Sequence, residues 1–155
     1  MIWNKREFNQ FDNVSLSDCH ISKIQKMENN IVIDFSEYGF FVRDSKNNRF
    51  YRTDGAQIII EDCDIDSVSI KEIRIHKLSG DTYFETMYDV QIEDFIKNIN
   101  EGMWKLEIVE EYPLKGKGYY IIWVNEGENC FWCHIKLRYK NLIYMWNKIK
   151  YNCPL

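Results

Sequence analysis

The fold is decided by residues 119–139, which read YYIIWVNEGENCFWCHIKLRY. Side chains at every second position of a β-strand face the same side, so a half-buried strand alternates between a core set and a more polar set. That alternation runs through residues 119–124 and again through residues 130–139, and Asn125-Glu126-Gly127 between them is a turn sequence. The stretch therefore predicts an antiparallel hairpin with one face in the core.

The same period continues on both sides of this hairpin. Residues 104–109 alternate before it, a turn is expected at 113–118, and a last strand at about 142–146. Nearer the N-terminus, alternating or apolar segments predict two hairpins and two further strands, at residues 19–27 with 31–35, at 40–43 with 49–52, at 57–62 and at 73–78. The register of the first segment is ambiguous and leaves room for a β-bulge.

One segment has a helical period instead. The apolar positions within residues 92–99 fall at i, i+3, i+4 and i+7, on one face of a helix that Asp89 is expected to cap and Gly102 to close. The spacing of the strands, about 8–12 residues, is typical of closed or layered β architectures. The chain is therefore predicted to be mainly β (α+β): an antiparallel β-sandwich, roll or barrel with one amphipathic helix near residues 90–100, in a single domain over residues 1–155.

The composition indicates a folded, mildly acidic protein with a net charge of −4. Proteins that bind nucleic acid usually carry a basic patch, because neutralisation of phosphates drives their affinity. Here basic and acidic residues are interleaved, so no nucleic-acid partner is expected. No apolar stretch approaches the roughly 20 residues that cross a bilayer, and the first residues lack the apolar core of a signal peptide. We expect a cytoplasmic protein without a membrane contact, its five cysteines reduced.

The sequence Cys130-Phe131-Trp132-Cys133-His134 matches the C-x-x-C-H pattern of c-type haem attachment. Within a strand, however, cysteines at these two positions point to opposite faces, which also opposes a thioredoxin-type redox pair. Structural zinc sites usually contain two closely spaced ligand pairs, and only one such pair is present. We therefore expect no cofactor and no metal, with the strand cysteines packed as small hydrophobic side chains.

The segment Asp62-Cys63-Asp64-Ile65-Asp66 resembles the start of an EF-hand calcium loop. Such a loop needs glycine at its sixth position and an acid at its twelfth, and here Ser67 and Ile73 occupy those places. The acidic run is therefore interpreted as a strand end and turn rather than as a calcium site.

No catalytic motif is present at the level of sequence. His20, His76 and His134 lie in separate predicted strands, and the neighbours of His20 in its strand face the other way. The phosphate-binding, dinucleotide-binding, nucleophile-elbow and zinc-protease motifs are missing. A non-enzymatic protein is therefore favoured over an enzyme. The alternative is a small-ligand-binding protein or an enzyme of unknown reaction that uses the cavity of a β-barrel or sandwich, with His20 or His134 inside.

Large aromatic residues of the predicted strands belong either to the core or to an interface: Trp132, Tyr120, Tyr144 and Trp146. If one face of a sheet stays open, Trp132 with His134, Lys136 and Arg138 would form an exposed amphipathic stripe. Aromatic residues and arginine are favoured in protein interfaces, so a homodimer formed through such a stripe is a further alternative.

Two stretches are similar to small β-rich immunity proteins of bacterial polymorphic-toxin systems and to related domains of unknown function. Residues 16–24, followed by the apolar strand at 31–35, resemble the opening of these proteins, although Ser17 stands where they usually have histidine. Residues 142–147 resemble their Tyr-x-Trp-Asn ending. The resemblance implies a bacterial cytoplasmic protein that neutralises a cognate toxin by stoichiometric binding, without catalysis.

The leading hypothesis is accordingly a non-enzymatic protein-binding domain, in its specific form an immunity-type inhibitor of a bacterial toxin. An acidic inhibitor can cover a basic site on its partner, and charge then raises the association rate more than the affinity. The expected contact residues lie in the two acidic segments: Asp62, Asp64, Asp66, Glu107, Glu110 and Glu111.

Overall fold

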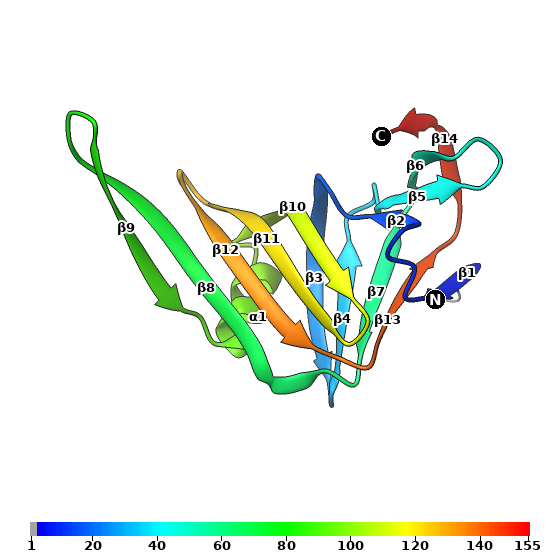
Figure 1. The fold of residues 1–155 in the computed structure, drawn as a ribbon, viewed down its shortest axis with the longest axis horizontal. Helices are drawn as coiled ribbons and strands as arrows, with labels where there is room; N and C mark the ends of the chain where they lie inside the picture. Colours follow the sequence, from blue (N-terminus) through cyan, green and yellow to red (C-terminus); the bar gives the residue numbers. More distant parts are fainter. Residues whose placement is uncertain (1–2) are drawn as a thin grey trace.

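The computed structural model describes residues 3–155, which form two antiparallel β-sheets and one helix (Figure 1). In sheet order, the strands of the larger sheet are β1 (Lys5–Phe8), β13 (Asn141–Trp146), β7 (Ala56–Glu61), β4 (Asn30–Phe35), β3 (Cys19–Met27), β10 (Lys105–Leu114), β11 (Lys117–Glu126), β12 (Asn129–Arg138), β8 (Asp64–Ser79) and β9 (Thr82–Asp89). The smaller sheet contains β14 (Ile149–Pro154), β6 (Arg49–Thr53), β5 (Phe41–Asp44) and β2 (Val14–Ser15). The helix α1 spans Ile92–Asn100.

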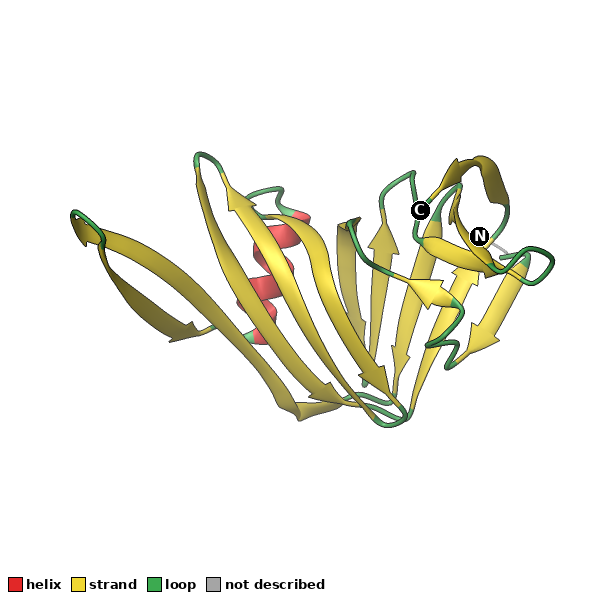
Figure 2. Ribbon diagram, turned by 45° about the horizontal axis from the view of Figure 1, so that its top comes forward, coloured by secondary structure: helices red, strands yellow, loops and turns green. Residues whose placement is uncertain are grey.

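The ten-stranded sheet is bent into an open trough rather than closed into a barrel (Figures 1 and 2). Its two edges are β1 and β9. The mainly β class with one short helix is confirmed, as are the hairpins β3–β4 and β5–β6 and the meander β10–β11–β12. A register shift between Ile21 and Lys23 confirms the bulge expected in β3.

The core lies on one face of this sheet. Ile58, Ile122 and Cys133 point into it from three strands, and Phe95 of α1 and Phe41 of the smaller sheet belong to the same buried cluster. Both the helix and the smaller sheet therefore cover the same face. Burial of apolar surface at about 25 cal/mol per Å² makes this cluster the main source of stability.

Buried aromatic rings join the two sheets. Phe40, fully buried just before β5, packs edge-on against Phe35, Tyr144 and Trp146 with ring centroids 5.6–6.0 Å apart. Edge-to-face pairs at this separation add about 0.5–1.5 kcal/mol each beyond their buried area.

The helix is placed where its apolar period predicts, but its start differs. Gln91 is the N-cap, and Asp89 is instead the last residue of β9, where it pairs with Lys71 of β8. The expectation that Asp89 caps the helix was wrong, because pairing with β8 holds the chain extended up to that residue. Gly102 closes the helix as predicted: its φ is +75° and its N–H donates to the carbonyl of Ile99 at 3.0 Å.

Four strands were missed from the sequence, namely β1, β2, β9 and β14. Strand β8 is also longer than predicted, since it runs over Asp64–Ser79 rather than residues 73–78 alone. With β9 it forms a hairpin whose turn is the far tip of the molecule in Figures 1 and 2.

Candidate functional site

The face of the large sheet opposite the core is the candidate functional surface. Ile122, Cys133 and Ile135 are buried in the core, so their sequence neighbours in β11 and β12 point to the other side. In Figure 1, α1 lies behind β10, β11 and β12, and this other side is toward the viewer. We call it the outer face; it includes Tyr112, Tyr119, Ile121, Trp123, Trp132 and His134.

Two tryptophans lie at the centre of the outer face. Trp123 of β11 is directly opposite Trp132 of β12, and their ring centroids are 4.5 Å apart in an edge-to-face arrangement. These two residues belong to a row of directly opposite residues that crosses five strands. The row runs from Glu107 of β10 through the two tryptophans to Ile73 of β8 and Met87 of β9. Both indoles are partly exposed. A cross-strand aromatic pair that keeps part of its surface in water is a ready contact for another molecule.

A second group of rings lies beside the tryptophans. The rings of Tyr112 and Tyr119 are stacked with centroids 5.9 Å apart, and Lys136 lies 5.4 Å from the centroid of Tyr119. The hydroxyl of Tyr119 is 2.7 Å from Nδ1 of His134. This hydrogen bond fixes the imidazole against the sheet, so His134 contributes to a rigid surface.

The predicted amphipathic stripe is present. Trp132, His134, Lys136 and Arg138 alternate with buried residues along β12 and all lie on the outer face. The other three aromatic residues singled out in the sequence differ from Trp132 because they face the core: Tyr120, Tyr144 and Trp146. Trp132 therefore belongs to the exposed stripe along β12, whereas the other three rings fill the interior. Only the register of each strand decides which face a given ring occupies.

Two of the predicted acidic contacts border the outer face. Glu107 is opposite Trp123, and Glu110 is opposite Ile121. Glu110 accepts a hydrogen bond from the hydroxyl of Tyr112 at 2.6 Å.

Of the three predicted aspartates, Asp64 lies at the far end of the same face, and Asp62 and Asp66 are its neighbours in the sequence. Asp62, Asp64 and Asp66 are exposed where β7 leads into β8. Asp64 is opposite Arg138 of β12 and forms an ion pair with it at 3.5 Å, so it shares the outer face. The acidic segments therefore bound this face at two places and do not form one continuous patch.

Glu111 is different, because a register shift in β10 after Ile108 turns it inward. Its carboxylate accepts a hydrogen bond from the backbone N–H of Leu16 at 2.5 Å. Burial raises the pKa of Glu111 to about 7, against a smaller lowering by that hydrogen bond. The carboxylate faces the interior, so Glu111 is removed from the set of expected contacts.

The cysteines of the C-x-x-C-H string lie on opposite sides of the sheet, as the strand period predicts. Cys130 is exposed, whereas Cys133 is fully buried and burial raises the pKa of its thiol to about 12. Residues 3–155 contain no group of three or more His, Cys, Asp or Glu side chains arranged to hold a metal ion. The string is therefore a strand sequence whose cysteines do not meet.

An internal cavity of about 80 Å³ lies between α1 and the large sheet. Apolar side chains line it, among them Ile24, Phe95, Ile122 and Leu137. Water occupies about 30 Å³ per molecule in the liquid, and pockets for small ligands usually measure about 300–1,000 Å³. The cavity is therefore well below the size of such pockets. None of its described lining residues is a histidine: His20 is exposed on β3 and His134 lies on the outer face.

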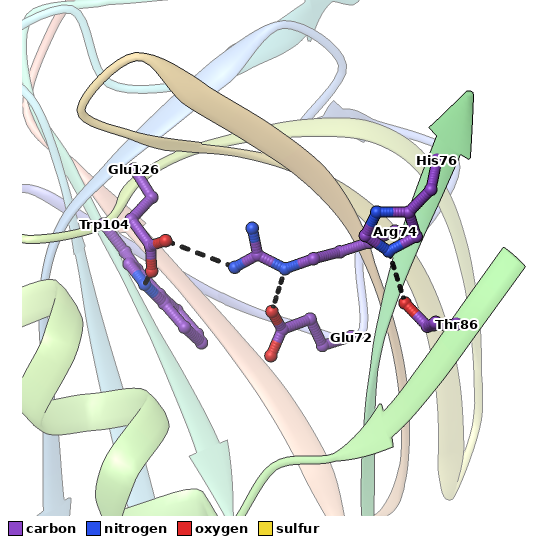
Figure 3. Close-up of polar contacts among 6 residues, drawn as sticks. All are labelled: Glu72, Arg74, His76, Thr86, Trp104 and Glu126. Atoms are coloured by element: carbon purple, nitrogen blue, oxygen red, sulfur yellow. Dashed lines mark hydrogen bonds and ion pairs between the residues drawn. The ribbon is translucent and has the colours of Figure 1, made fainter. Parts of the chain in front are cut away.

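A polar cluster lies on the core side of β8, where the β8–β9 hairpin leaves the body of the protein (Figure 3). Arg74 donates to Glu72 at 2.5 Å and to Glu126 at 3.2 Å, and Trp104 donates its indole N–H to Glu126 at 2.6 Å. Every charged group here has a partner of opposite charge or a hydrogen-bond donor. The cluster therefore serves as a structural clamp. Its only trace in the sequence is the spacing of Glu72 and Arg74, two residues of opposite charge on the same face of a strand.

None of the helices in the described chain is long and apolar enough to span a membrane. Comparison with protein-family models, with curated proteins and with solved structures finds no match to the chain.

Proposed function

We propose that this chain is a non-enzymatic protein-binding domain and that its partner binds the outer face around Trp123 and Trp132. The observation that carries the proposal is this pair of partly exposed indoles, 4.5 Å apart, on the face of the sheet away from the helix and the smaller sheet. Tryptophan is among the residues most enriched at the energetic centre of protein interfaces. Isolated exposed apolar residues need no explanation, but a paired and rigid aromatic group marks a contact surface.

The two indoles can supply part of the free energy of specific binding. Each indole is only partly exposed, so a partner can remove roughly 50 Å² of it from water, a gain of about 1 kcal/mol per ring at about 25 cal/mol per Å². Truncation of one such residue in known interfaces costs about 2 kcal/mol or more, which is roughly a thirtyfold loss of affinity. Trp123 and Trp132 therefore are expected to dominate the affinity.

Acidic groups lie beside the indoles and can attract basic groups of a partner, while Lys136 and Arg138 of the same face can meet acidic ones. Glu107 and Glu110 lie beside the tryptophan row on β10, and Asp64 lies at the end of the same face with Asp62 and Asp66 next to it. Acidic groups at the rim of an interface steer a basic partner and raise its association rate, particularly at low salt. Five of the six acidic residues expected from the sequence keep this role in the proposal.

An immunity-type inhibitor of a bacterial toxin is the specific form of this function that we favour. Such a protein needs a rigid surface that covers a basic functional site, and it needs no catalytic group. The acidic border of the outer face and the resemblance of residues 16–24 and 142–147 to immunity proteins support this form. The small, apolar cavity beneath the helix weighs against a ligand held in the interior of the protein.

Affinity capture of the tagged protein from an extract of its source cells, followed by mass spectrometry, tests the proposal. We expect a polypeptide in one-to-one ratio with the bait, and for the inhibitor form we expect that the purified partner is toxic or enzymatically active until this protein is added. Recovery of the protein alone, or with a small molecule retained under native mass spectrometry, would contradict the proposal. A partner whose activity is unchanged by the complex would leave protein binding standing but exclude the inhibitor form.

A further inference from the structure

The β8–β9 hairpin extends beyond the neighbouring strands of the large sheet, and its turn is the far tip of the molecule (Figures 1 and 2). Strand β9 carries large exposed side chains on both faces: Tyr83 is 57% exposed, Phe84 45%, Met87 55% and Tyr88 53%. Tyr83 and Met87 share the outer face, and Phe84 and Tyr88 share the core side of the sheet. Four large apolar or aromatic residues on one eight-residue strand are far more than scattered surface exposure explains.

The two edges of the ten-stranded sheet are built differently. Strand β1 is four residues long and carries Lys5 and Arg6, which are features that blunt an edge against pairing. Strand β9 is eight residues long and has neither proline nor lysine. Its outward backbone N–H and C=O groups form a template for one more antiparallel strand.

We propose that a second copy of this chain pairs along β9, antiparallel, about a two-fold axis at Thr86. The axis runs perpendicular to the sheet, so the outer face of one copy continues into the outer face of the other. A two-fold axis of this kind requires that each residue meets a residue of the same face, and hence that the axis passes through a residue of β9 rather than between two.

The charges of β9 select the position of the axis. An axis at Glu85 would place the two copies of Glu85 opposite each other, and an axis at Met87 would place Glu85 opposite Asp89. Like charges directly opposite in a sheet are destabilising. An axis at Thr86 avoids both arrangements, because Glu85 then faces Met87 and Tyr83 faces Asp89. Axes further along the strand would pair fewer residues of β9.

The same position of the axis also gives the best side-chain pairs. Thr86 faces its own copy, and on either side of it Phe84 faces Tyr88 of the other copy, so two aromatic pairs flank a threonine pair. Aromatic pairs and threonine pairs are favourable cross-strand neighbours, each worth about 0.2–1 kcal/mol relative to alanine. The exposed rings of β9 thus find partners in the second copy.

The size of the contact predicts a weak dimer. An aromatic side chain buries about 150–250 Å² in full, and the rings of Phe84 and Tyr88 have roughly half of that left to lose, so the four rings together contribute on the order of 400 Å². Even with the strand backbones, the interface stays below the roughly 1,200–1,600 Å² of a stable complex. Dissociation in the micromolar range is expected. The dimer goes beyond the proposed function and uses a different part of the sheet.

Sedimentation velocity over a range from about 1 µM to about 1 mM, which brackets a micromolar dissociation constant, tests the inference. The wild-type protein is expected to shift from monomer to dimer. Thr86→Lys and Thr86→Glu, measured separately, are expected to stay monomeric because each places two like charges at the axis. An equimolar mixture of the two variants is expected to dimerise again, since lysine then faces glutamate. Gln25→Lys, an exposed position on the central strand β3, is the matched control and should dimerise like the wild type.

The mixture keeps the test independent of folding. Thr86 is hydrogen-bonded to His76 at 2.9 Å, so both substitutions also remove a contact within the hairpin. Loss of that contact cannot produce a heterodimer from two monomeric variants. A wild-type protein that is monomeric throughout the range, a Thr86→Lys variant that still dimerises, or a mixture that stays monomeric would each overturn the inference.

Discussion

The guanidinium of Arg74 lies 4.1 Å from the centroid of the Phe131 ring, and this contact ties the projecting β8–β9 hairpin to the body of the large sheet. Glu72 and Glu126 hold the guanidinium from two sides, at 2.5 and 3.2 Å (Figure 3). Trp104, which follows the helix, bonds to the same Glu126. The arrangement joins β8, the end of β11 and the segment between α1 and β10 through one cation.

Replacement of this cation is expected to weaken the fold. Arg74→Met keeps much of the side-chain volume but leaves Glu72, whose side chain is only 15% exposed, without its counter-charge. We expect a loss of about 1–3 kcal/mol in the free energy of unfolding, measured by urea denaturation. Lys77→Met, at an exposed position of the same strand, is the control and should change stability by less than about 0.5 kcal/mol. Equal effects of the two substitutions would show that the cluster is not a clamp.

The buried carboxyl of Glu111 gives stability a specific pH dependence. Burial raises its pKa from 4.5 to about 7 in the folded protein. The folded state therefore holds the proton more tightly than the unfolded state, and this group's contribution is lost as pH rises from about 4.5 through about 7. The loss is on the order of 3 kcal/mol.

Glu111→Gln removes this titration while keeping an acceptor for the N–H of Leu16. The variant is expected to be more stable than the wild type above about pH 7, with the difference shrinking toward pH 4.5. Urea denaturation at a series of pH values measures it. Glu128→Gln, in the exposed turn after β11, is the control and should follow the wild type. A constant difference between Glu111→Gln and the wild type across this range would contradict the assignment.

Gly39 is required by space as well as by backbone conformation. Its φ is +58°, and a Cβ atom there would lie 1.9 Å from Oγ1 of the fully buried Thr53. Gly127 has a nearly identical φ of +59° but open space around it. Gly127→Ala should cost about 1 kcal/mol through backbone strain alone, whereas Gly39→Ala should cost more than about 3 kcal/mol or prevent folding. Thermal unfolding followed by circular dichroism compares them, and similar melting temperatures would refute the steric argument.

The hydroxyl of Tyr139, the residue that follows β12, ties the β10–β11 turn to the end of that strand. It lies 2.6 Å from the carbonyl oxygen of Leu114 and 2.8 Å from that of Lys117, which share its single proton. Tyr139→Phe should cost about 1–2 kcal/mol and speed amide hydrogen exchange in residues 114–118. Tyr151→Phe, an exposed tyrosine of β14, is the control. Unchanged exchange in the turn would show that the hydroxyl does not hold it.

Strands that are buried on one face could be predicted well from the sequence. The contrast between Ile122 or Cys133 and their neighbours produces a period of two, and the spacing of Phe95 and Ile99 produces a helical period. Strand β9 could not be found in this way, because Tyr83 and Met87 on one face and Phe84 and Tyr88 on the other remove the contrast. Large apolar side chains on both faces of β9 thus make it the proposed self-contact and also prevent its recognition as a strand from the sequence.

The candidate site was predicted in part. Trp132, His134, Lys136 and Arg138 do form a stripe on one face, because strand alternation alone determines it. The orientation of Glu111 could not be predicted, since it depends on a register shift in β10 that turns the strand after Ile108. The pairing of Trp123 with Trp132 likewise depends on the register between two strands, which the turn sequence does not fix to the residue.

The most direct test of the central claim is the amount of partner polypeptide that co-purifies with a bait in which both indoles are removed. Trp123→Ser with Trp132→Ser is compared with the wild type and with Tyr38→Ser plus Tyr151→Ser, a control that removes two exposed rings elsewhere on the molecule. We predict that the control retains the partner at the wild-type level and that the double tryptophan variant, folded by circular dichroism, loses it. Equal recovery of the partner by all three proteins would contradict the assignment of the outer face as the binding surface.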